Sequence, residues 1–174
     1  MSKINRSPMS VLPLICCLAL LSLTAPGEAG EWAVYFSPHG GCTEAVVSAV
    51  DQARTSLHVQ AYSFSARPII KALSAARARG VAVAVILDQS QRRFSGLAAL
   101  LADGVPAWLD AAHQIAHNKV MIIDGETVIT GSFNFTRSAE EHNAENLLVV
   151  HNNALAARYE TNFQAHLAHS SPVR

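Results

Sequence analysis

Cysteine, net charge and long apolar segments are all scarce in this sequence of 174 residues. It contains 3 cysteines, and they form no cluster of the kind that makes a structural zinc site. The 13 Lys and Arg residues balance the 13 Asp and Glu residues, so the chain lacks the strongly basic profile of a dedicated nucleic-acid-binding domain. No internal repeat or low-complexity segment is present, and the length suits one domain.

The one long apolar segment lies near the N-terminus. Lys3 and Arg6 precede an apolar run from Val11 to Leu23, and Gly27-Glu28-Ala29 places small residues at −3 and −1 of a cleavage site. This pattern predicts a signal peptide over residues 1–29, and hence a periplasmic or secreted protein. The alternative is a membrane anchor, but the run is shorter than the ~20 residues that span a bilayer. We therefore expect no stable anchor after cleavage.

Cleavage would remove Cys16 and Cys17 and leave Cys42 alone in a catalytic domain of residues 30–174. No intrachain disulfide is then expected, despite an oxidising destination. We expect Cys42 to be a partly buried free thiol, with a bridge to a second copy as the alternative.

Expected strands and helices alternate along most of the domain. Strand patterns occur at 32–36, 57–61, 81–87, 105–109 and 145–151. Helices are expected to begin at Ser65 and to span 97–102, and Thr43 and Asn153 are expected to cap two more. The continuous apolar run at 81–87 is typical of a strand covered on both faces. The sequence therefore predicts an α/β/α sandwich with a mixed, largely parallel sheet. Sites in such sheets lie beyond the carboxyl ends of the strands.

The segment from 117 to 134 has the most informative pattern. Apolar runs flank Asp124-Gly125-Glu126, which predicts a β-hairpin. Side chains alternate along a strand, so His117 and Lys119 share a face, as do Ser132 and Asn134. With a Gly125-Glu126 loop, His117 lies opposite Asn134, and Lys119 lies opposite Ser132.

With an Asp124-Gly125 loop, His117 instead lies opposite Ser132, and Lys119 lies opposite Thr130. Either register gathers an imidazole, an ammonium, a hydroxyl and an amide, which together can attack and hold a tetrahedral anion. Asp124 has the opposite parity from His117, so we expect it to be structural.

These residues match a known pattern. The spacing His-x-Lys-x4-Asp-x6-Gly-Ser-x-Asn, from His117 through Gly131 to Asn134, resembles the signature of the phospholipase D superfamily at every specified position. The chain from about residue 31 to 169 resembles that superfamily's small, secreted, single-motif bacterial endonuclease. The resemblance implies cleavage of a phosphodiester without a metal or other cofactor.

The chemistry requires groups on both sides of phosphorus. Attack and departure are roughly in line, so one rigid imidazole cannot serve both at once. Larger members of the superfamily carry the signature twice, and this chain carries it once. The resemblance therefore implies a homodimer whose twofold axis runs through the active site.

In this scheme His117 of one subunit attacks and forms a phosphohistidine. His117 of the other subunit protonates the leaving oxygen and later activates water. Lys119 and Asn134 hold the phosphoryl oxygens, and Ser132 adds a hydrogen bond.

Glu145 resembles the acidic residue that orients the histidine in this superfamily. Alternatively it is a surface glutamate at the start of a strand, and Glu140 and Glu141 are nearby competitors. No metal is expected. His113 and His117 have the spacing of a metal-binding pair on a helix, but the stretch that follows has strand character.

The substrate is less well defined than the reaction. Positive residues gather between 54 and 93, where Arg92 and Arg93 lie in an expected loop that could flank the site. Contacts to phosphates carry no base preference, which favours a sequence-nonspecific endonuclease acting on DNA or RNA. Alternatively, Arg92 and Arg93 lie in an ordinary exposed loop with no role in binding.

The other candidate functions are a phospholipase D-type lipid phosphodiesterase and an inactive nucleic-acid-binding module. The intact His117, Lys119 and Asn134 argue against the inactive module.

Overall fold

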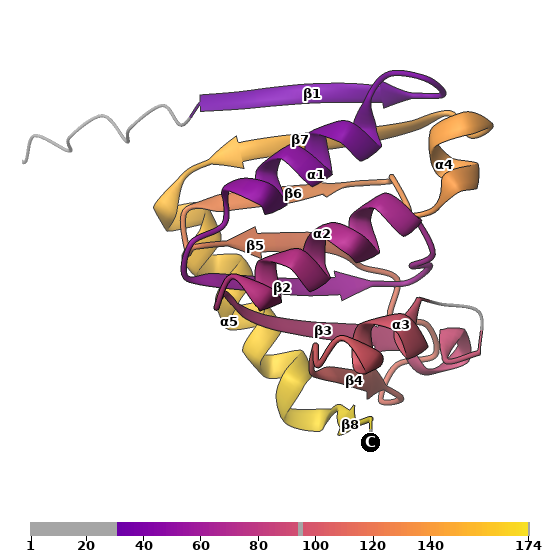
Figure 1. Cartoon of the computed structure of the whole chain (residues 1–174), viewed down its shortest axis with the longest axis vertical. Coiled ribbons are helices and arrows are strands. Elements are labelled where there is room, and N and C mark those ends of the chain that lie inside the picture. Colours follow the sequence, from indigo (N-terminus) through magenta and orange to yellow (C-terminus); the bar gives the residue numbers. More distant parts are fainter. Residues whose placement is uncertain (1–30, 94–95, 174) are drawn as a thin grey trace, which may run out of the picture.

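The structure, a computed structural model, describes residues 31–93 and 96–173. A single sheet of eight strands forms the middle layer, with the order β1-β7-β6-β5-β2-β3-β4-β8 (Figure 1). The strands are β1 (Glu31–Ser37), β2 (Ser56–Ala61), β3 (Ala82–Asp88), β4 (Ala107–Asp110), β5 (Lys119–Ile123), β6 (Thr127–Gly131), β7 (Glu145–His151) and β8 (Ser171–Pro172). The expected signal peptide, with Cys16 and Cys17, lies outside the described residues.

Helices cover both faces of the sheet. One face carries α1 (Cys42–Gln52), α2 (Arg67–Ala78) and α3 (Leu97–Ala102), while α5 (Asn153–His169) crosses the other (Figure 1). A short 3-10 turn, η1 (Gln89–Gln91), follows β3, and α4 (Arg137–Glu141) precedes β7. The predicted α/β/α sandwich with a mixed sheet is confirmed. None of the described helices has the length and apolar character needed to cross a membrane.

The parallel part of the sheet is smaller than the sequence predicted. Among the described strands, only the pairs β2–β3 and β3–β4 are parallel. The hairpin β5–β6 pairs antiparallel with β2, and β7, β1 and β8 add further antiparallel pairs. Tight hairpins connect only antiparallel strands, so the segment with the signature changes the direction of that half of the sheet.

The start of α1 is fixed by a residue far away in the sequence. The helix begins at Cys42, and Thr43 lies inside it rather than capping it as predicted. The carboxylate of Glu140 accepts hydrogen bonds from the backbone N–H of Gly41 (3.2 Å) and of Thr43 (2.7 Å). A carboxylate is favourable there because it satisfies free N–H groups at the positive end of the helix. This contact fastens α4 to α1.

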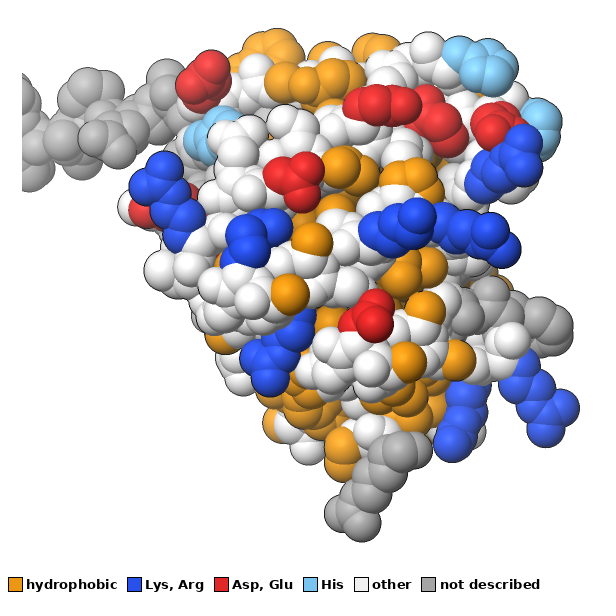
Figure 2. Space-filling view, viewed as in Figure 1, with side chains coloured by type: hydrophobic (Ala, Val, Ile, Leu, Met, Phe, Trp, Pro, Cys, Tyr) orange, Lys and Arg blue, Asp and Glu red, His pale blue; other side chains and the backbone are white. Residues whose placement is uncertain are grey.

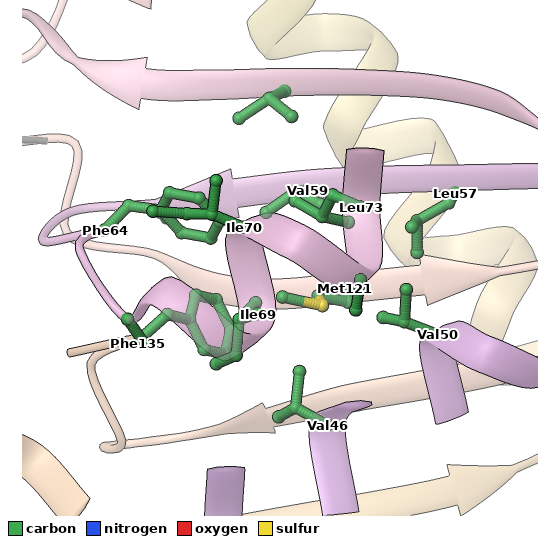
Figure 3. Close-up of a cluster of buried hydrophobic side chains, with 14 of the residues drawn as sticks. Val46, Val50, Leu57, Val59, Phe64, Ile69, Ile70, Leu73, Met121 and Phe135 are labelled. Carbon is green, nitrogen blue, oxygen red and sulfur yellow. The ribbon is translucent and has the colours of Figure 1, made fainter. Parts of the chain in front are cut away.

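The larger core lies between the sheet and helices α1 and α2. Figure 3 shows Val46 and Val50 of α1, Ile69 and Leu73 of α2, and Met121 of β5 meeting in it. These five side chains are fully buried, and each contributes roughly 1.5–3 kcal/mol through burial. Cys42 is also fully buried. Burial, reinforced by Glu140, raises the pKa of its thiol to about 11. Cys42 is therefore more deeply buried than the sequence predicted.

A second core lies under α5. Phe163 is fully buried there with Ile86, Val120 and Val128. The ring of His58 stacks on Phe163 with centroids 4.5 Å apart, and its Nδ1 lies 2.8 Å from the Glu160 carboxylate.

The cap of α5 is one residue earlier than predicted. It is Asn152, not Asn153, whose side chain accepts a hydrogen bond from the N–H of Leu155 at 2.8 Å.

Candidate active site

The register of the β5–β6 hairpin differs from both predicted registers. Val120 lies opposite Thr130, and Ile123 opposite Thr127. Asp124 and Gly125 adopt positive φ angles of 56° and 69°, as a type I′ turn requires. The N–H of Glu126 donates to the carbonyl of Ile123 at 3.0 Å and closes the turn. Glu126 itself is not paired with β5, because the first pair joins Ile123 to Thr127. This additional turn residue shifts the strands relative to each other.

A second irregularity at the end of β6 compensates for this shift. The N–H groups of Ser132 and Phe133 both donate to the carbonyl of Asn146, each at 3.1 Å. Two successive donors on one acceptor are the pattern of a β-bulge, which redirects the side chains that follow. Gly131 enters the bulge with a φ of 148°, and a Cβ there would clash with the Asn146 carbonyl. Asn134 consequently turns toward the start of β5.

Six of the predicted residues meet in one pocket despite the changed register. It has a volume of about 290 Å³ and is lined by His117, Lys119, Gly131, Ser132, Asn134 and Glu145. It lies at the edge of the sheet where β2 ends and β5 and β7 begin. A larger cavity of about 1060 Å³ lies at the opposite end, beside Arg54, Asp124 and His151. We place the site in the smaller pocket because an imidazole, an ammonium, an amide and a carboxylate converge there.

His117 is exposed, but its backbone is held on both sides. The N–H of Ala116 donates to the buried carboxylate of Asp88 at 2.7 Å. The carbonyl of Asn118 accepts from the N–H of Tyr62 at 3.0 Å. The rings of Tyr62 and His117 have centroids 4.7 Å apart. The imidazole is therefore presented to solvent from a fixed position.

Lys119 is buried beside it, with 7% of its surface exposed. Its Nζ donates to the carbonyl of His117 at 2.8 Å and lies 5.6 Å from the centroid of the Tyr62 ring. Burial lowers the pKa of this ammonium, and the nearby charge of Glu145 partly opposes that shift. Lys119 is thus a cation with little solvation, and so interacts more strongly with an anion than a surface lysine does.

Two buried aromatic side chains position Asn134. Phe133 and Phe135 are both fully buried, so the residue between them is held at the pocket. The amide oxygen of Asn134 is buried and has no hydrogen-bond partner in the described part of the chain, which leaves it available to a hydrogen-bond donor. Ser132 is already engaged, since its Oγ accepts from the backbone N–H and the side-chain amide of Asn146.

Of the three competing glutamates, only Glu145 lines the pocket. Glu140 caps α1, and Glu141 accepts a 2.7 Å hydrogen bond from Arg137. The carboxylate of Glu145 accepts from the side chain of Asn143 at 3.3 Å. Within the described residues, no hydrogen bond joins Glu145 to His117, so the expected orienting contact is not made inside one chain.

Asp124 lies at the far end of the hairpin, away from His117. Its carboxylate accepts hydrogen bonds from the backbone N–H groups of Arg54, Thr55 and Ser56 and from the Thr55 hydroxyl, at 2.7 to 3.2 Å. Burial alone would raise its pKa, but these donors lower it below the ordinary aspartate value. This residue joins the hairpin turn to the start of β2.

The predicted basic surface is mixed in sign. Figure 2 shows Lys and Arg side chains interspersed with Asp and Glu on the face formed by α1 and α2. Arg77 and Arg79 donate to backbone carbonyls of Gly104 and Val50. Arg92 and Arg93 are exposed and follow η1, beyond the carboxyl end of β3. They lie at the same edge of the sheet as His117 but do not line the pocket.

Two residues that position the site were not singled out from the sequence: Tyr62 and Asp88. Both are polar groups that come directly at or after the end of an apolar strand, β2 and β3, a position that could have identified them. His113 and His117 have the spacing of a metal-binding pair on a helix, but the structure does not place them on one. Residues 111–118 form no helix, and His113 instead contacts Asp110.

Comparison with known proteins places this geometry in a family. A family model described as "Cardiolipin synthase, PLD-like domain" matches residues 46–167. The chain is 43% identical over 130 residues to "Phospholipase D" of Rickettsia conorii, covering 74% of this chain and 65% of that relative's length. It is 31% identical over 115 residues to "Mitochondrial cardiolipin hydrolase" of Xenopus tropicalis, covering 65% of this chain and 55% of that protein.

A solved structure agrees with both findings. The crystal structure of Nuc from Salmonella typhimurium, described as a phospholipase D family member, superposes with a TM-score of 0.79. The two chains are 39% identical, and the match covers 83% of this chain and 99% of the other. NucT from Helicobacter pylori, at 24% identity and a TM-score of 0.75, shares the fold.

Proposed function

The chain belongs to the phospholipase D superfamily, and from this premise we propose that it is a phosphodiesterase, namely a sequence-nonspecific endonuclease with a homodimeric, metal-independent active site. The single observation that carries the proposal is the pocket where exposed His117, buried Lys119 and the side-chain amide of Asn134 converge. The predicted signal peptide adds the proposal that the enzyme acts in the periplasm or outside the cell.

The proposed reaction has two steps. An imidazole nitrogen of His117 attacks phosphorus, the bond from phosphorus to the leaving oxygen breaks, and a phosphohistidine forms. His117 of the partner subunit gives its proton to the leaving oxygen, then takes a proton from the water that hydrolyses the intermediate. The Lys119 ammonium and the side-chain NH2 group of Asn134 donate hydrogen bonds to the non-bridging oxygens and stabilise their charge, and the cation held in low dielectric takes the place of a metal.

The proposed dimer places a second copy against the exposed edge of the sheet. Trp32, Val34 and Phe36 alternate along β1 and are 65%, 43% and 63% exposed. Phe36 lies opposite Asn146, and the next residue, Ser37, lies opposite Glu145, so this apolar strip begins beside the pocket. Exposed apolar strips of this kind mark interfaces, and a second copy is the occupant that also supplies the missing imidazole.

Glu145 acquires a role in this dimer. Its carboxylate makes no hydrogen bond to His117 within the described chain, although both line the pocket. We propose that it accepts a hydrogen bond from the imidazole of His117 of the partner subunit, which would fix the tautomer and stabilise the imidazolium.

The nuclease proposal is supported by the open access to His117 and by the exposed Arg92 and Arg93 at the same edge, where they could bind neighbouring phosphates. A lipid phosphodiesterase is the second candidate. The names of the relatives, phospholipase D and mitochondrial cardiolipin hydrolase, favour it.

One experiment separates these candidates. The purified protein is incubated in excess chelator with supercoiled plasmid, with RNA, and with vesicles of phosphatidylcholine and cardiolipin. We expect nicking of the plasmid by wild type and by His142→Asn, a control whose exposed ring lies outside the pocket, and none by His117→Asn. If lipid headgroups are released while the plasmid stays intact, the nuclease proposal is wrong and the lipid phosphodiesterase is favoured. Activity that requires a divalent ion would refute the mechanism.

Subunit mixing tests the shared site. Wild type is unfolded and refolded with an equal amount of His117→Asn, so that the subunits assort at random. If both imidazoles are needed, only wild-type pairs cut, and activity falls to roughly a quarter of that of an all-wild-type sample at the same total protein concentration. A value near one half would show that each chain acts alone.

A further inference from the structure

A second cluster of titratable side chains lies outside the pocket. Asp110 ends β4, and His113 follows three residues later. His166 and His169 lie in the last turn of α5. One nitrogen or oxygen atom from each of the four residues lies within 4.8 Å of the others.

The three imidazoles converge on one oxygen atom. Nδ1 of His166, Nδ1 of His113 and Nε2 of His169 lie 2.8, 3.1 and 3.2 Å from Oδ2 of Asp110. The other oxygen, Oδ1, accepts the N–H of Ala112 at 2.9 Å and lies 3.2 Å from Nδ1 of His113. A carboxylate oxygen has about two lone pairs, so the three rings and the backbone N–H would use every lone pair that the two oxygens offer.

The rings also crowd one another. Their centroids are 4.9 to 5.2 Å apart in all three pairs, so protonated imidazoles would repel. Neutral imidazoles offer lone pairs instead, and a cation among them would accept those lone pairs together with one from the carboxylate. The arrangement suits a central cation better than a network of hydrogen bonds alone.

We propose that Asp110, His113, His166 and His169 form a structural binding site for a divalent transition metal of the zinc type. Zinc takes His nitrogen and carboxylate oxygen at ~2.0–2.2 Å in a tetrahedron, which puts neighbouring ligand atoms roughly 3.4 Å apart. The observed separations are 2.8 to 3.2 Å from Oδ2 and at most 4.8 Å among the four ligand atoms, so side-chain rotations of about an ångström would bring them to that geometry. Four protein ligands close the coordination sphere, as in structural sites.

Several features around the cluster suit this role. Asp110 is fully buried, and its second oxygen is already fixed by Ala112, as ligating carboxylates usually are. The C-terminal end of α5 carries negative potential, which favours a cation. The side chains of His113 and His169 are 47% and 35% exposed, so an ion could enter from solvent.

The site would join parts of the chain that are distant in sequence. After α5 the chain continues into β8, where Ser171 pairs with Leu109 of β4. A metal would therefore fasten α5 and β8 to the edge of the sheet. None of the four ligands lines the pocket around His117, so the ion would take no part in phosphodiester cleavage.

Metal binding by the purified protein tests the proposal. After treatment with chelator and its removal, the protein is titrated with Zn²⁺, and bound metal is counted by native mass spectrometry. Co²⁺ is used as a second probe, because tetrahedral Co²⁺ absorbs visible light strongly. We expect one ion per chain, a tetrahedral Co²⁺ spectrum, and a Tm that rises by roughly 5–10 °C at saturating Zn²⁺.

Variants assign the binding to this cluster. His113→Ala/His169→Ala should bind no stoichiometric Zn²⁺ and show no rise in Tm, while His142→Ala should behave as wild type. Circular dichroism in chelator checks that the double variant is folded. If it is not, the single exposed variant His169→Asn should show Zn²⁺ affinity reduced at least tenfold.

Three results would overturn the site: no binding by wild type, equal binding by the double variant, or loss of binding in His142→Ala. The phosphodiesterase assay in chelator is independent of all three, so failure of the metal site and failure of the proposed nuclease are distinguishable.

Discussion

The two ends of the β5–β6 hairpin use polar residues in opposite ways. At the turn, Asp124 receives four donor groups from the chain, and its carboxylate is fully engaged. At the other end, His117 is exposed, and the amide oxygen of Asn134 is buried without a hydrogen-bond partner in the described residues. Polar groups satisfied by the chain stabilise it, whereas polar groups held rigidly but left unsatisfied are available to a substrate. The comparison predicts that substitutions at the two ends separate stability from activity.

The largest expected effect is at the open end. His117→Asn should lower kcat by roughly 10³- to 10⁴-fold because the proposed nucleophile and proton donor are both lost. Its ring contacts that of Tyr62 and is exposed, so the free energy of unfolding should change by less than about 0.5 kcal/mol. Plasmid nicking and urea denaturation measure the two quantities. A stable variant with at least a tenth of wild-type activity would remove His117 from the mechanism.

Gly131→Ala should lower both stability and activity. It therefore tests whether one residue of the hairpin can serve the fold and the site together. The new Cβ would meet the carbonyl of Asn146, at a φ of 148° that only glycine readily adopts. We expect a loss of about 2–3 kcal/mol in stability, and a fall of roughly 10²-fold in kcat, because the bulge that aims Asn134 is displaced. Normal activity in the folded fraction would show that the bulge does not position the amide.

Asp124→Asn should lower stability with little change in kcat of the folded protein. Removing the charge weakens hydrogen bonds to several backbone donors, which costs about 1–3 kcal/mol. The wild-type carboxyl has a folded pKa below its unfolded value. The stabilisation of the folded state by this carboxylate is therefore complete above the unfolded pKa of ~3.9. It is lost as pH falls through the folded pKa. Urea unfolding between about pH 3 and pH 7 should show a steeper acid loss for wild type than for the variant, and equal slopes would contradict this account.

The smallest effect is expected at the flanking loop. Arg92→Gln/Arg93→Gln should raise KM for plasmid by roughly 2- to 5-fold and reduce the salt dependence of binding by about one to two phosphate contacts, with kcat unchanged. Lys71→Gln is a matched control, since Lys71 is exposed on α2. If the arginine variant and the Lys71→Gln control change KM and salt dependence equally, Arg92 and Arg93 have no specific role in substrate binding.

Periodicity predicted the strands and helices well because it reports burial on one face. The expected strand at 145–151 and helix at 97–102 coincide with β7 and α3. The start of α1 was predicted wrongly because Glu140, which caps it, lies almost a hundred residues away. Local sequence cannot show a cap that arrives through tertiary structure.

The candidate site was predictable for a different reason. Glu126 in the turn and the bulge after Gly131 each shift the strand by one residue, and a total shift of two returns the later side chains to the same face. Strict alternation therefore gave the wrong register, while the spacing of the signature still identified residues that meet. Tyr62, Asp88 and the histidines around Asp110 were not found, because their proximity depends on how β2, β3, β4 and α5 are arranged.

The position of β1 has a consequence for biosynthesis. This strand pairs with β7, so that Glu31 meets His151, and the first strand to leave the ribosome must wait for one of the last. Until then Trp32 and Phe36 sit on a strand whose backbone donors and acceptors have no sheet to join. Such long-range pairing is slow to form, so the described domain completes its fold late in synthesis, and this delay would suit the proposed export of the protein.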